Sequence, residues 1–417
     1  MFRSLRLFNY RIWFLGALVS NIGTWMQRTA QDWLVYDILT HQDAAAMGIV
    51  MALQLGPQLL LAPWAGLIAD TYNRRKVLLF TQVAMAMLGL GLGVLVLSGE
   101  AQLWHVYAFA LALGVVSAVD APARQSFVSE VVGEADLPNA VALNSASFNA
   151  ARMVGPAAAG LLTVAVGPGW VFLINTFTFA AMVLALLKMR SGELRILPKA
   201  APGKGRIRAG LRYVRHRPDL MMVLLAIFIV GTFGLNFAVY IAAMARTEFG
   251  QDAGIFGLLN SVMAIGSVTG ALLSARRDKP RLRFIFGAAG AFGLACLVAA
   301  ASPTLLWFAV SLIPVGLFAL TLMTSANAYV QTTTTPVMRG RVMALYFAIF
   351  MGGTPIGAPL VGWVSNSFGP RWSLGVAAAS GIITAVVGLI WAWRSQHLRL
   401  SYDRTLPRRL HLTTRET

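Results

Sequence analysis

Residues 66–98 read GLIADTYNRRKVLLFTQVAMAMLGLGLGVLVLS, a short polar loop that ends in three basic residues and runs into an uncharged apolar stretch. A helix of about 20 apolar residues is long enough to cross the hydrocarbon core of a bilayer. Similar runs recur along the chain of 417 residues, of which 57% are hydrophobic and only 12% are charged. Soluble domains carry about 25% charged residues. The composition therefore excludes a water-soluble protein and predicts an integral membrane protein.

The apolar runs predict twelve membrane-spanning helices. Between the fifth and the sixth, Gly167-Pro168-Gly169 is the only punctuation. We therefore expect an all-α integral membrane fold, with twelve transmembrane helices arranged as two six-helix bundles. The expected spans are residues 12–38, 46–69, 77–98, 103–121, 140–166, 169–190, 220–245, 253–275, 283–302, 304–330, 342–365 and 372–393.

The formal net charge of +18 is distributed unevenly along the chain. Of the 34 Lys and Arg residues, 30 fall in the N-terminal stretch, the even-numbered loops and the C-terminal tail. Loops rich in Lys and Arg stay in the cytoplasm, whereas acidic residues count little. For this reason the stretch 120–138, with one Arg and four acidic residues, does not alter the assignment. We expect a multi-pass protein of a bacterial-type cytoplasmic (inner) membrane, with both termini in the cytoplasm.

Several classes of function are excluded at this level. No basic stretch carries the interleaved aromatic residues of a nucleic-acid site, so we expect no nucleic-acid partner. No phosphate-binding loop, His cluster or pair of carboxylates indicates an enzyme, a cofactor, a metal site or a catalytic residue. The single cysteine, Cys296, excludes a disulfide framework. The stretch Phe2–Arg11 lacks a cleavage-type ending and is interpreted as a signal anchor.

The longest polar stretch, residues 191–219, divides the expected spans into two groups of six. Within it, the segment Gly210–Arg217 is either a short amphipathic helix on anionic lipid or part of a solvated tether. We expect two six-helix bundles, at residues 1–190 and 220–394. A basic cytoplasmic linker, 191–219, joins them, and a basic cytoplasmic tail, 395–417, follows the second. The halves echo each other, since Gly155 and Gly160 recur as Gly357 and Gly362, 202 residues later. Parallel repeats of this kind predict a transporter with a binding site between the halves near the midplane.

The loop quoted above resembles the signature loop of the major facilitator superfamily of transporters. The family pattern is a Gly, an Asp four residues later and a basic cluster after it. This chain departs from the pattern at two positions: Thr71 stands where a basic residue is usual, and Asn73 stands where Gly is usual. The resemblance implies a latch on the cytoplasmic side, in which Gly allows close helix packing and Asp pairs with cations. The gate motif consists of Gly66, Asp70, Arg74, Arg75 and Lys76.

A second stretch, in the fifth expected span, is similar to the antiporter motif of the same superfamily. Its first Gly is Ala151 here, and Gly155, Pro156 and Gly160 follow at the family's spacing. Pro156 removes a backbone hydrogen bond, and the small residues permit close helix packing. The stretch indicates either an exporter that exchanges substrate for protons or a packing interface with no bearing on direction.

Two further stretches resemble the enterobactin-exporter and multidrug-efflux branch of the superfamily. They are Asp120-Ala-Pro-Ala-Arg124-Gln125 with the segment after Leu137, and Arg339-Gly-Arg341-Val-Met-Ala-Leu345. The resemblance extends over essentially the whole chain. It implies a transport mechanism and leaves the substrate open.

A charge at membrane depth is costly and is a functional hypothesis by default, and three charged residues stand out as candidates. Arg28 and Asp32 lie in the first span and Arg152 in the fifth, and they are the candidates for proton coupling. Asn21 and Trp25 share one helical face with Arg28 and Asp32, so this face should line a cavity. One turn apart, Arg28 and Asp32 are able to pair.

These charges leave alternatives open. Burial disfavours the charged form of Asp32 and Arg28 favours it, so Asp32 is either a proton carrier or half of a structural ion pair. Arg152 holds an anionic substrate, pairs with Asp32 or joins the first helix to the fifth. Polar residues around them either line the substrate cavity or bond between helices. These substrate-cavity candidates are Asn21, Trp25, Gln54, Gln58, Asn149, Asn236, Tyr240 and Asn327.

Together, these features predict a secondary active transporter that exports drug-like or siderophore-like molecules against protons by alternating access. Its expected partners are a small-molecule substrate, protons and the lipid bilayer, and we expect a functional monomer. One alternative is a facilitator or importer of the same fold that does not use protons. A different class, a non-transporting membrane sensor or assembly subunit, is the other alternative.

Overall fold

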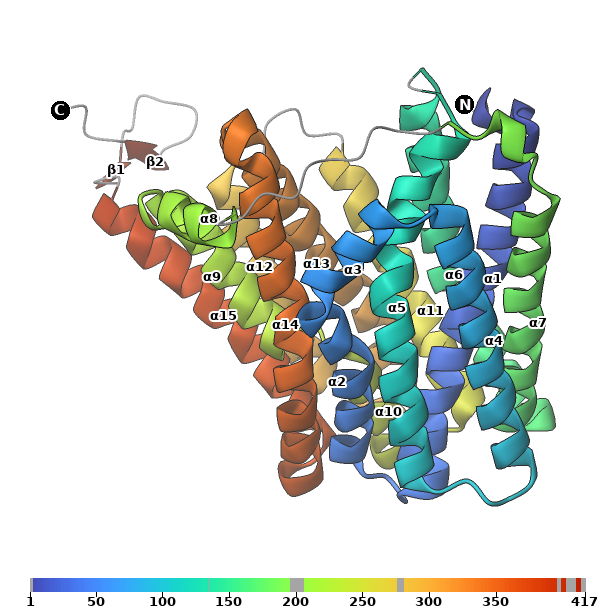
Figure 1. Cartoon of the computed structure of the whole chain (residues 1–417). Helices are drawn as coiled ribbons and strands as arrows, with labels where there is room; N and C mark the ends of the chain where they lie inside the picture. Colours follow the sequence, from blue (N-terminus) through green and yellow to red (C-terminus); the bar gives the residue numbers. More distant parts are fainter. Residues whose placement is uncertain are drawn as a thin grey trace.

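The computed structural model describes residues 3–133, 135–195, 206–275, 281–395, 399–402 and 410–413. Figure 1 shows long helices side by side, with the start of α1 and the end of α15 at the same end of the molecule. We call this end the terminal end and the other the opposite end. The first half contains η1 Arg3–Arg6, α1 Phe8–Trp33, η2 Leu34–Leu39, α2 Ala44–Leu60, α3 Ala62–Thr71, α4 Arg74–Leu97, α5 Leu103–Val131, α6 Leu137–Val166, α7 Pro168–Lys188 and η3 Ser191–Glu193.

The second half repeats this arrangement of helices and ends in a small hairpin. Its strands, β1 and β2, pair antiparallel, with Arg399 opposite Thr413, and the sequence did not predict them. The elements are α8 Arg206–Arg215, α9 Pro218–Phe233, α10 Phe237–Ala243, η4 Met244–Glu248, α11 Ala253–Ala275, α12 Leu282–Ala300, α13 Leu305–Thr333, α14 Pro336–Phe368, α15 Pro370–Ser395, β1 Arg399–Tyr402 and β2 Leu410–Thr413.

The all-helical membrane fold predicted from the sequence is confirmed. Within the described ranges, ten helices are long and apolar enough to cross a membrane, with Pro218–Glu248 counted as one. Two expected spans are not among these ten. The range 12–38 falls on α1 and η2, which carry Arg28 and Asp32, and the range 46–69 falls on α2 and α3, which are separated at Leu61.

Local sequence explains where these helices begin and end. Asp43 caps α2, since its carboxylate accepts from the backbone N–H groups of Ala45 and Ala46 at 2.8 and 3.0 Å. Asn73, in an extended conformation, caps α4, since its side chain accepts from the backbone N–H of Lys76. Gly167 (φ +88°) and Gly369 (φ +99°) form the corner before α7 and α15, and each precedes a proline at the first helical position.

The helix α5 is longer than the sequence indicated. The expected span ended at residue 121 and was followed by a loop, 120–138, whereas α5 continues to Val131. Asp120 and Arg124 therefore lie on a helix, one turn apart, and Asp120 is only 6% exposed. Pro122 did not end the helix, and the acidic residues after it hid the continuing helical pattern.

Helices of the two halves contact each other through small residues. On α6, a Cβ at Gly160 would meet the backbone of Ala253 at the start of α11, and on α2 a Cβ at Gly48 would meet the backbone of Ala358 on α14. Any side chain larger than hydrogen would push these helices apart. The two helix pairs α6–α11 and α2–α14 thus form the main helix contacts between the halves.

Candidate functional site

Two cavities are lined by residues of α1. The first, about 690 Å³, is lined by residues of α1, α2, α4, α5, α6 and α7 and runs from Trp13 and Val128 near the terminal end to Arg28. The second, about 190 Å³, is lined by both halves, from Trp25 on α1 to Asn260 on α11. We call them the terminal-side cavity and the central cavity. Arg28 lines both, so it stands where the two meet.

The central cavity brings together the three charged residues expected inside the membrane. Arg28, Asp32 and Arg152 all line it. Asp32 is 9% exposed. None of the three takes a hydrogen bond or an ion pair with another described residue, and Arg28 Nε is buried without an acceptor. The structure thus does not contain the direct Arg28–Asp32 pair that the one-turn spacing permits.

Instead of forming that pair, Arg28 packs against the ring of Trp25, and so does Arg152. The Cζ atoms of Arg28 and Arg152 lie 5.5 and 5.8 Å from the centroid of this ring. The ring itself packs edge-on against Phe148 of α6, with centroids 5.8 Å apart. Cation–π attraction is strongest for Trp and increases where water is excluded. The central cavity therefore contains two cations on an aromatic platform and one carboxylate.

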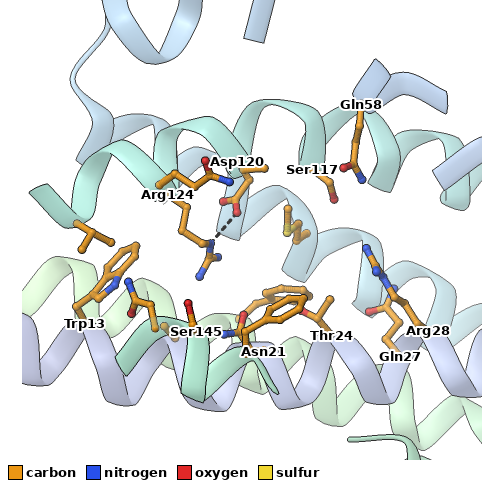
Figure 2. A pocket seen from close by; sticks show the side chains of 18 of the residues that line it. Trp13, Asn21, Thr24, Gln27, Arg28, Gln58, Ser117, Asp120, Arg124 and Ser145 are labelled. Atoms are coloured by element: carbon orange, nitrogen blue, oxygen red, sulfur yellow. Dashed lines mark hydrogen bonds and ion pairs between the residues drawn. The ribbon is translucent and has the colours of Figure 1, made fainter. Parts of the chain in front are cut away.

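The predicted neutral residues divide among different places. Gln54 lines the central cavity, where its amide nitrogen is buried without a partner. Asn21, Gln58 and Asn149 line the terminal-side cavity, and Figure 2 shows Asn21 on α1 below the space, with Gln58 across from Arg28. Five predicted residues of the first half, counting Trp25, thus lie on one or the other of the two cavities.

The predicted residues of the second half do not join them. Asn236 is fully buried and donates to the carbonyl of Thr232 at 2.7 Å, and Tyr240 donates its hydroxyl to the carbonyl of Phe233. Both side chains satisfy carbonyls freed by the break between α9 and α10. Asn327 lines a separate cavity of about 270 Å³ between α13 and α14. The second half instead lines the central cavity with residues that the sequence analysis missed: Leu235, Phe237, Ala238, Phe256, Asn260 and Met263.

The gate motif ties helices together at the terminal end of the first half. Arg74 pairs with Glu130 of α5 and donates from Nε to the carbonyl of Ala69 at 3.0 Å. Arg75 donates from Nε to the carbonyl of Leu186 on α7 at 2.8 Å. A Cβ at Gly66 would meet no atom within 4 Å, so the close helix packing expected there is absent from the described structure. The side chain of Asp70 lies outside the described residues, and Lys76 lies in the first turn of α4.

The antiporter-like motif packs α6 against both α1 and α11. A Cβ at Gly155 would lie 2.6 Å from Cβ of Trp25, and the carbonyl of Pro156 faces Gly257 of α11. Ala151 is fully buried on the same helix. Together with the Gly160 contact described above, the motif fixes the platform residue Trp25 and joins the halves at the same place.

The halves are bonded to each other at the opposite end. Arg246 of η4 donates from Nε to Asp37 of η2 at 2.6 Å, and Thr247 bonds to the hydroxyl of Tyr36 at 2.6 Å. Asn366 of α14 donates to Asp43 at 2.6 Å. Among the described residues, the hydrogen bonds between the halves all lie in this region, which we call the opposite-end latch. The structure is therefore closed at the opposite end, and its large cavity extends toward the terminal end.

Comparison with known proteins gives a consistent result. The family model described as transmembrane secretion effector matches residues 2–405. The staphyloferrin A transporter of Staphylococcus aureus is 23% identical over 94% of this chain and 98% of its own length. The enterobactin exporter EntS of Escherichia coli is 26% identical over 91% of this chain and 90% of its own length.

Solved structures share the fold. A peptide transporter of the POT family in complex with sulfate has a TM-score of 0.75 at 12% identity, over 93% of this chain and 94% of that one. A bacterial homologue of the lysosomal transporter Spinster, in an inward-facing and unoccupied conformation, has a TM-score of 0.68 at 14% identity, over 92% and 95%. At these identities the likeness concerns the fold alone.

Proposed function

Because the chain belongs to the transmembrane secretion effector family of major facilitator transporters, we propose that it exports a siderophore-like or drug-like molecule in exchange for protons. The chain is a multi-pass membrane transporter by its family and fold. The export direction, the proton coupling and the substrate class are the parts that we propose. Siderophore relatives cover nearly the whole chain, which favours that class of substrate.

One observation carries the proton coupling: Asp32 is a buried carboxylate without a protein partner, in the cavity that both halves line. Buried charges are normally paired. An unpaired carboxylate in the cavity that also contains Arg28 and Arg152 is placed to exchange a proton with little rearrangement. With Asp32 charged, its carboxylate accepts a hydrogen bond from a donor group of the substrate; with Asp32 protonated, that charged acceptor is lost.

This arrangement couples the two ligands through charge. The substrate donor and the proton compete for the carboxylate of Asp32, so proton binding from the opposite end favours substrate release there, whereas loss of the proton to the terminal end favours substrate uptake. Alternating access then requires that the opposite-end latch open and the terminal end close. One pH unit supplies about 1.4 kcal/mol per proton, and a membrane potential adds about 2.3 kcal/mol per charge per 100 mV.

The orientation is part of the proposal. The terminal end carries most of the basic residues, so we assign it to the cytoplasm by the positive-inside rule. The structure then corresponds to the state that takes up substrate from the cytoplasm. Residues 1–190 and 220–394 serve as the two moving bundles, 191–219 as the linker between them and 395–417 as the tail, in a protein that works as a monomer.

The test is proton movement in liposomes that enclose a pH-sensitive dye. A gradient of a catecholate, a citrate-type polycarboxylate or a cationic dye is imposed on the purified protein. We expect the active substrate to drive proton flux in the native protein and in Glu100→Gln, which removes an exposed carboxylate at the opposite end. Substrate flux without proton flux would establish the facilitator instead, and no flux with any compound would favour the sensor.

A further inference from the structure

A second charged cluster lies along the terminal-side cavity, away from Arg28, and the proposed coupling makes no use of it. Asp120 of α5 accepts hydrogen bonds from Thr81 Oγ1 at 2.7 Å and Gln82 Nε2 at 2.9 Å, both on α4. It also pairs with Arg124 Nε at 2.9 Å. Figure 2 shows this pair between Trp13 and Arg28, on the Trp13 side of the space. Three groups from two helices, Thr81, Gln82 and Asp120, therefore fix the position of one guanidinium.

The guanidinium of Arg124 is fixed but not saturated. Its Nε is committed to Asp120, and its Cζ lies 5.7 Å from the centroid of the Trp13 ring on α1. Its terminal nitrogens take no acceptor among the described residues, and Nη1 is buried. Arginine has five N–H donors in a planar fork, so it is able to bond one carboxylate along Nε and another through its terminal nitrogens.

Trp13 supplies an independent sign of a missing acceptor. The side chain is 1% exposed, and its indole N–H is buried without a partner. Buried donors are nearly always bonded, so each exception needs an explanation. Here two unmet donors, from Trp13 and Arg124, belong to side chains that stack on each other and line the same cavity. Both donors require an oxygen acceptor. Because one of them belongs to a guanidinium, an anionic oxygen fits best.

The other end of the cavity also has a buried donor without an acceptor. Arg28 lines it and has a buried Nε without an acceptor. Trp13 and Arg28 are 15 residues apart on α1, which corresponds to about 22 Å along the helix axis. Between them the cavity offers neutral hydrogen-bonding groups, including Asn21, Thr24 and Ser145. The space is thus long, polar without charge in its middle, and short of acceptors at both ends.

We propose that the terminal-side cavity binds an elongated molecule that carries a carboxylate-type group at each end, one held by Arg28 and the other by Arg124 with Trp13. The inference rests on the proposed function, because it takes this cavity as the substrate path. Asp120 is a positioning residue, since it orients Arg124 without touching the ligand. A molecule with one acidic end engages only one anchor, so the separation of the two groups selects among substrates.

The test is equilibrium binding by calorimetry to the full chain in detergent, with no gradient. The probes are oligo(ethylene glycol) chains of increasing length with a carboxylate at both ends, and their monomethyl esters. We expect diacids able to separate their ends by about 15–20 Å to bind at least tenfold more tightly than their monoesters, and short diacids to show no advantage.

Substitutions assign the advantage to its residues. Arg124→Gln should abolish the preference for the long diacid and lower monoester affinity by no more than about twofold, because the monoester still binds at Arg28. Trp13→Phe should reduce the preference for the long diacid about threefold by removing only the N–H donor. Because Arg124→Gln leaves Asp120 without its cation, the double variant Arg124→Gln/Asp120→Asn is measured as well, with the same expected loss. The control is Arg11→Gln, which removes an exposed cation from α1, the helix that carries Trp13 and Arg28.

A long-diacid advantage that is absent, or that survives in the double variant, overturns the two-anchor site. Proton coupling is not needed for binding at equilibrium. Diacid binding without proton flux in liposomes would therefore count against the antiport alone, whereas proton flux without diacid selectivity would count against the two-anchor site alone.

Discussion

Opening the opposite-end latch should move the protein toward its other conformation. The double variant Arg246→Gln/Asn366→Ala removes the ion pair with Asp37 and the amide bond to Asp43. The Arg246 and Asp37 side chains are 36% and 18% exposed, so solvent screening limits their pair to about 0.5–1 kcal/mol. The bond from Asn366 goes to a charged group at a partly exposed site and adds about 1 kcal/mol. The sum is about 2 kcal/mol, or roughly a 30-fold change in the equilibrium between the conformations.

Labelling of an introduced cysteine measures that equilibrium. Asn260→Cys places a thiol in the central cavity, and a membrane-impermeant maleimide is added from the opposite side of oriented vesicles. The native Cys296 is fully buried, so it adds little background. The labelling rate follows the fraction of molecules open to that side, and we expect it to rise about 10- to 30-fold in the double variant, in line with the free-energy change.

A matched control separates the latch from general weakening. Glu248 pairs with Arg371 at 2.9 Å with side-chain exposures of 29% and 38%, at the same end, but both residues belong to the second half. Glu248→Gln should leave the labelling rate near that of the native protein. An unchanged rate in the latch variant, or an equal rise in Glu248→Gln, would show that the bonds between the halves do not hold this end closed.

Three further outcomes follow from the packing. Gly160→Val should lower the thermal midpoint and raise labelling from the opposite side, because its side chain would meet the backbone of Ala253. Tyr240→Phe should cost about 0.6–1.5 kcal/mol of stability, since the hydroxyl of Tyr240 bonds to the carbonyl of Phe233. Substrate affinity should not change, and a weakened affinity would show that Tyr240 contacts the substrate. Trp25→Ala should weaken substrate binding about tenfold or more, because both guanidinium groups lose their platform; unchanged binding in a correctly folded variant would contradict that role.

Helical periodicity was sufficient to locate one face of the site. Asn21, Trp25, Arg28 and Asp32 recur on one side of α1, and the structure places all of them on one cavity or the other. The spacing did not reveal which partner Arg28 would take. Residues one turn apart are able to pair, but the guanidinium of Arg28 lies over Trp25, where it shares the ring with Arg152.

Two errors have a common physical cause, namely that hydropathy does not report backbone breaks. The run from 220 to 245 contains no polar stretch that marks the end of α9 at Phe233, so Asn236 and Tyr240 resembled cavity residues. Their side chains instead satisfy carbonyls at that break. Conversely, acidic residues after Pro122 resembled a loop, although α5 continues to Val131 and buries Asp120.

The contributions of the second half were the least predictable. Phe256 and Met263 are ordinary apolar residues of α11, and only the packing of α11 against α6 brings them to Arg28 and Asp32. Contacts between helices separated by about a hundred residues leave no periodic signal in one sequence. The glycines that permit this contact were recognised as a motif, but their partner helix was not.

The central claim is that Asp32 carries the coupling proton. The most direct test compares two activities, namely accumulation of substrate against its gradient and exchange of substrate across the membrane. In liposomes, Asp32→Asn should still exchange labelled for unlabelled substrate across the membrane at a rate near that of the native protein. It should no longer accumulate substrate when a pH gradient is imposed, because the asparagine keeps its shape and does not titrate. Accumulation driven by the pH gradient in Asp32→Asn would contradict the claim and assign the proton to another group.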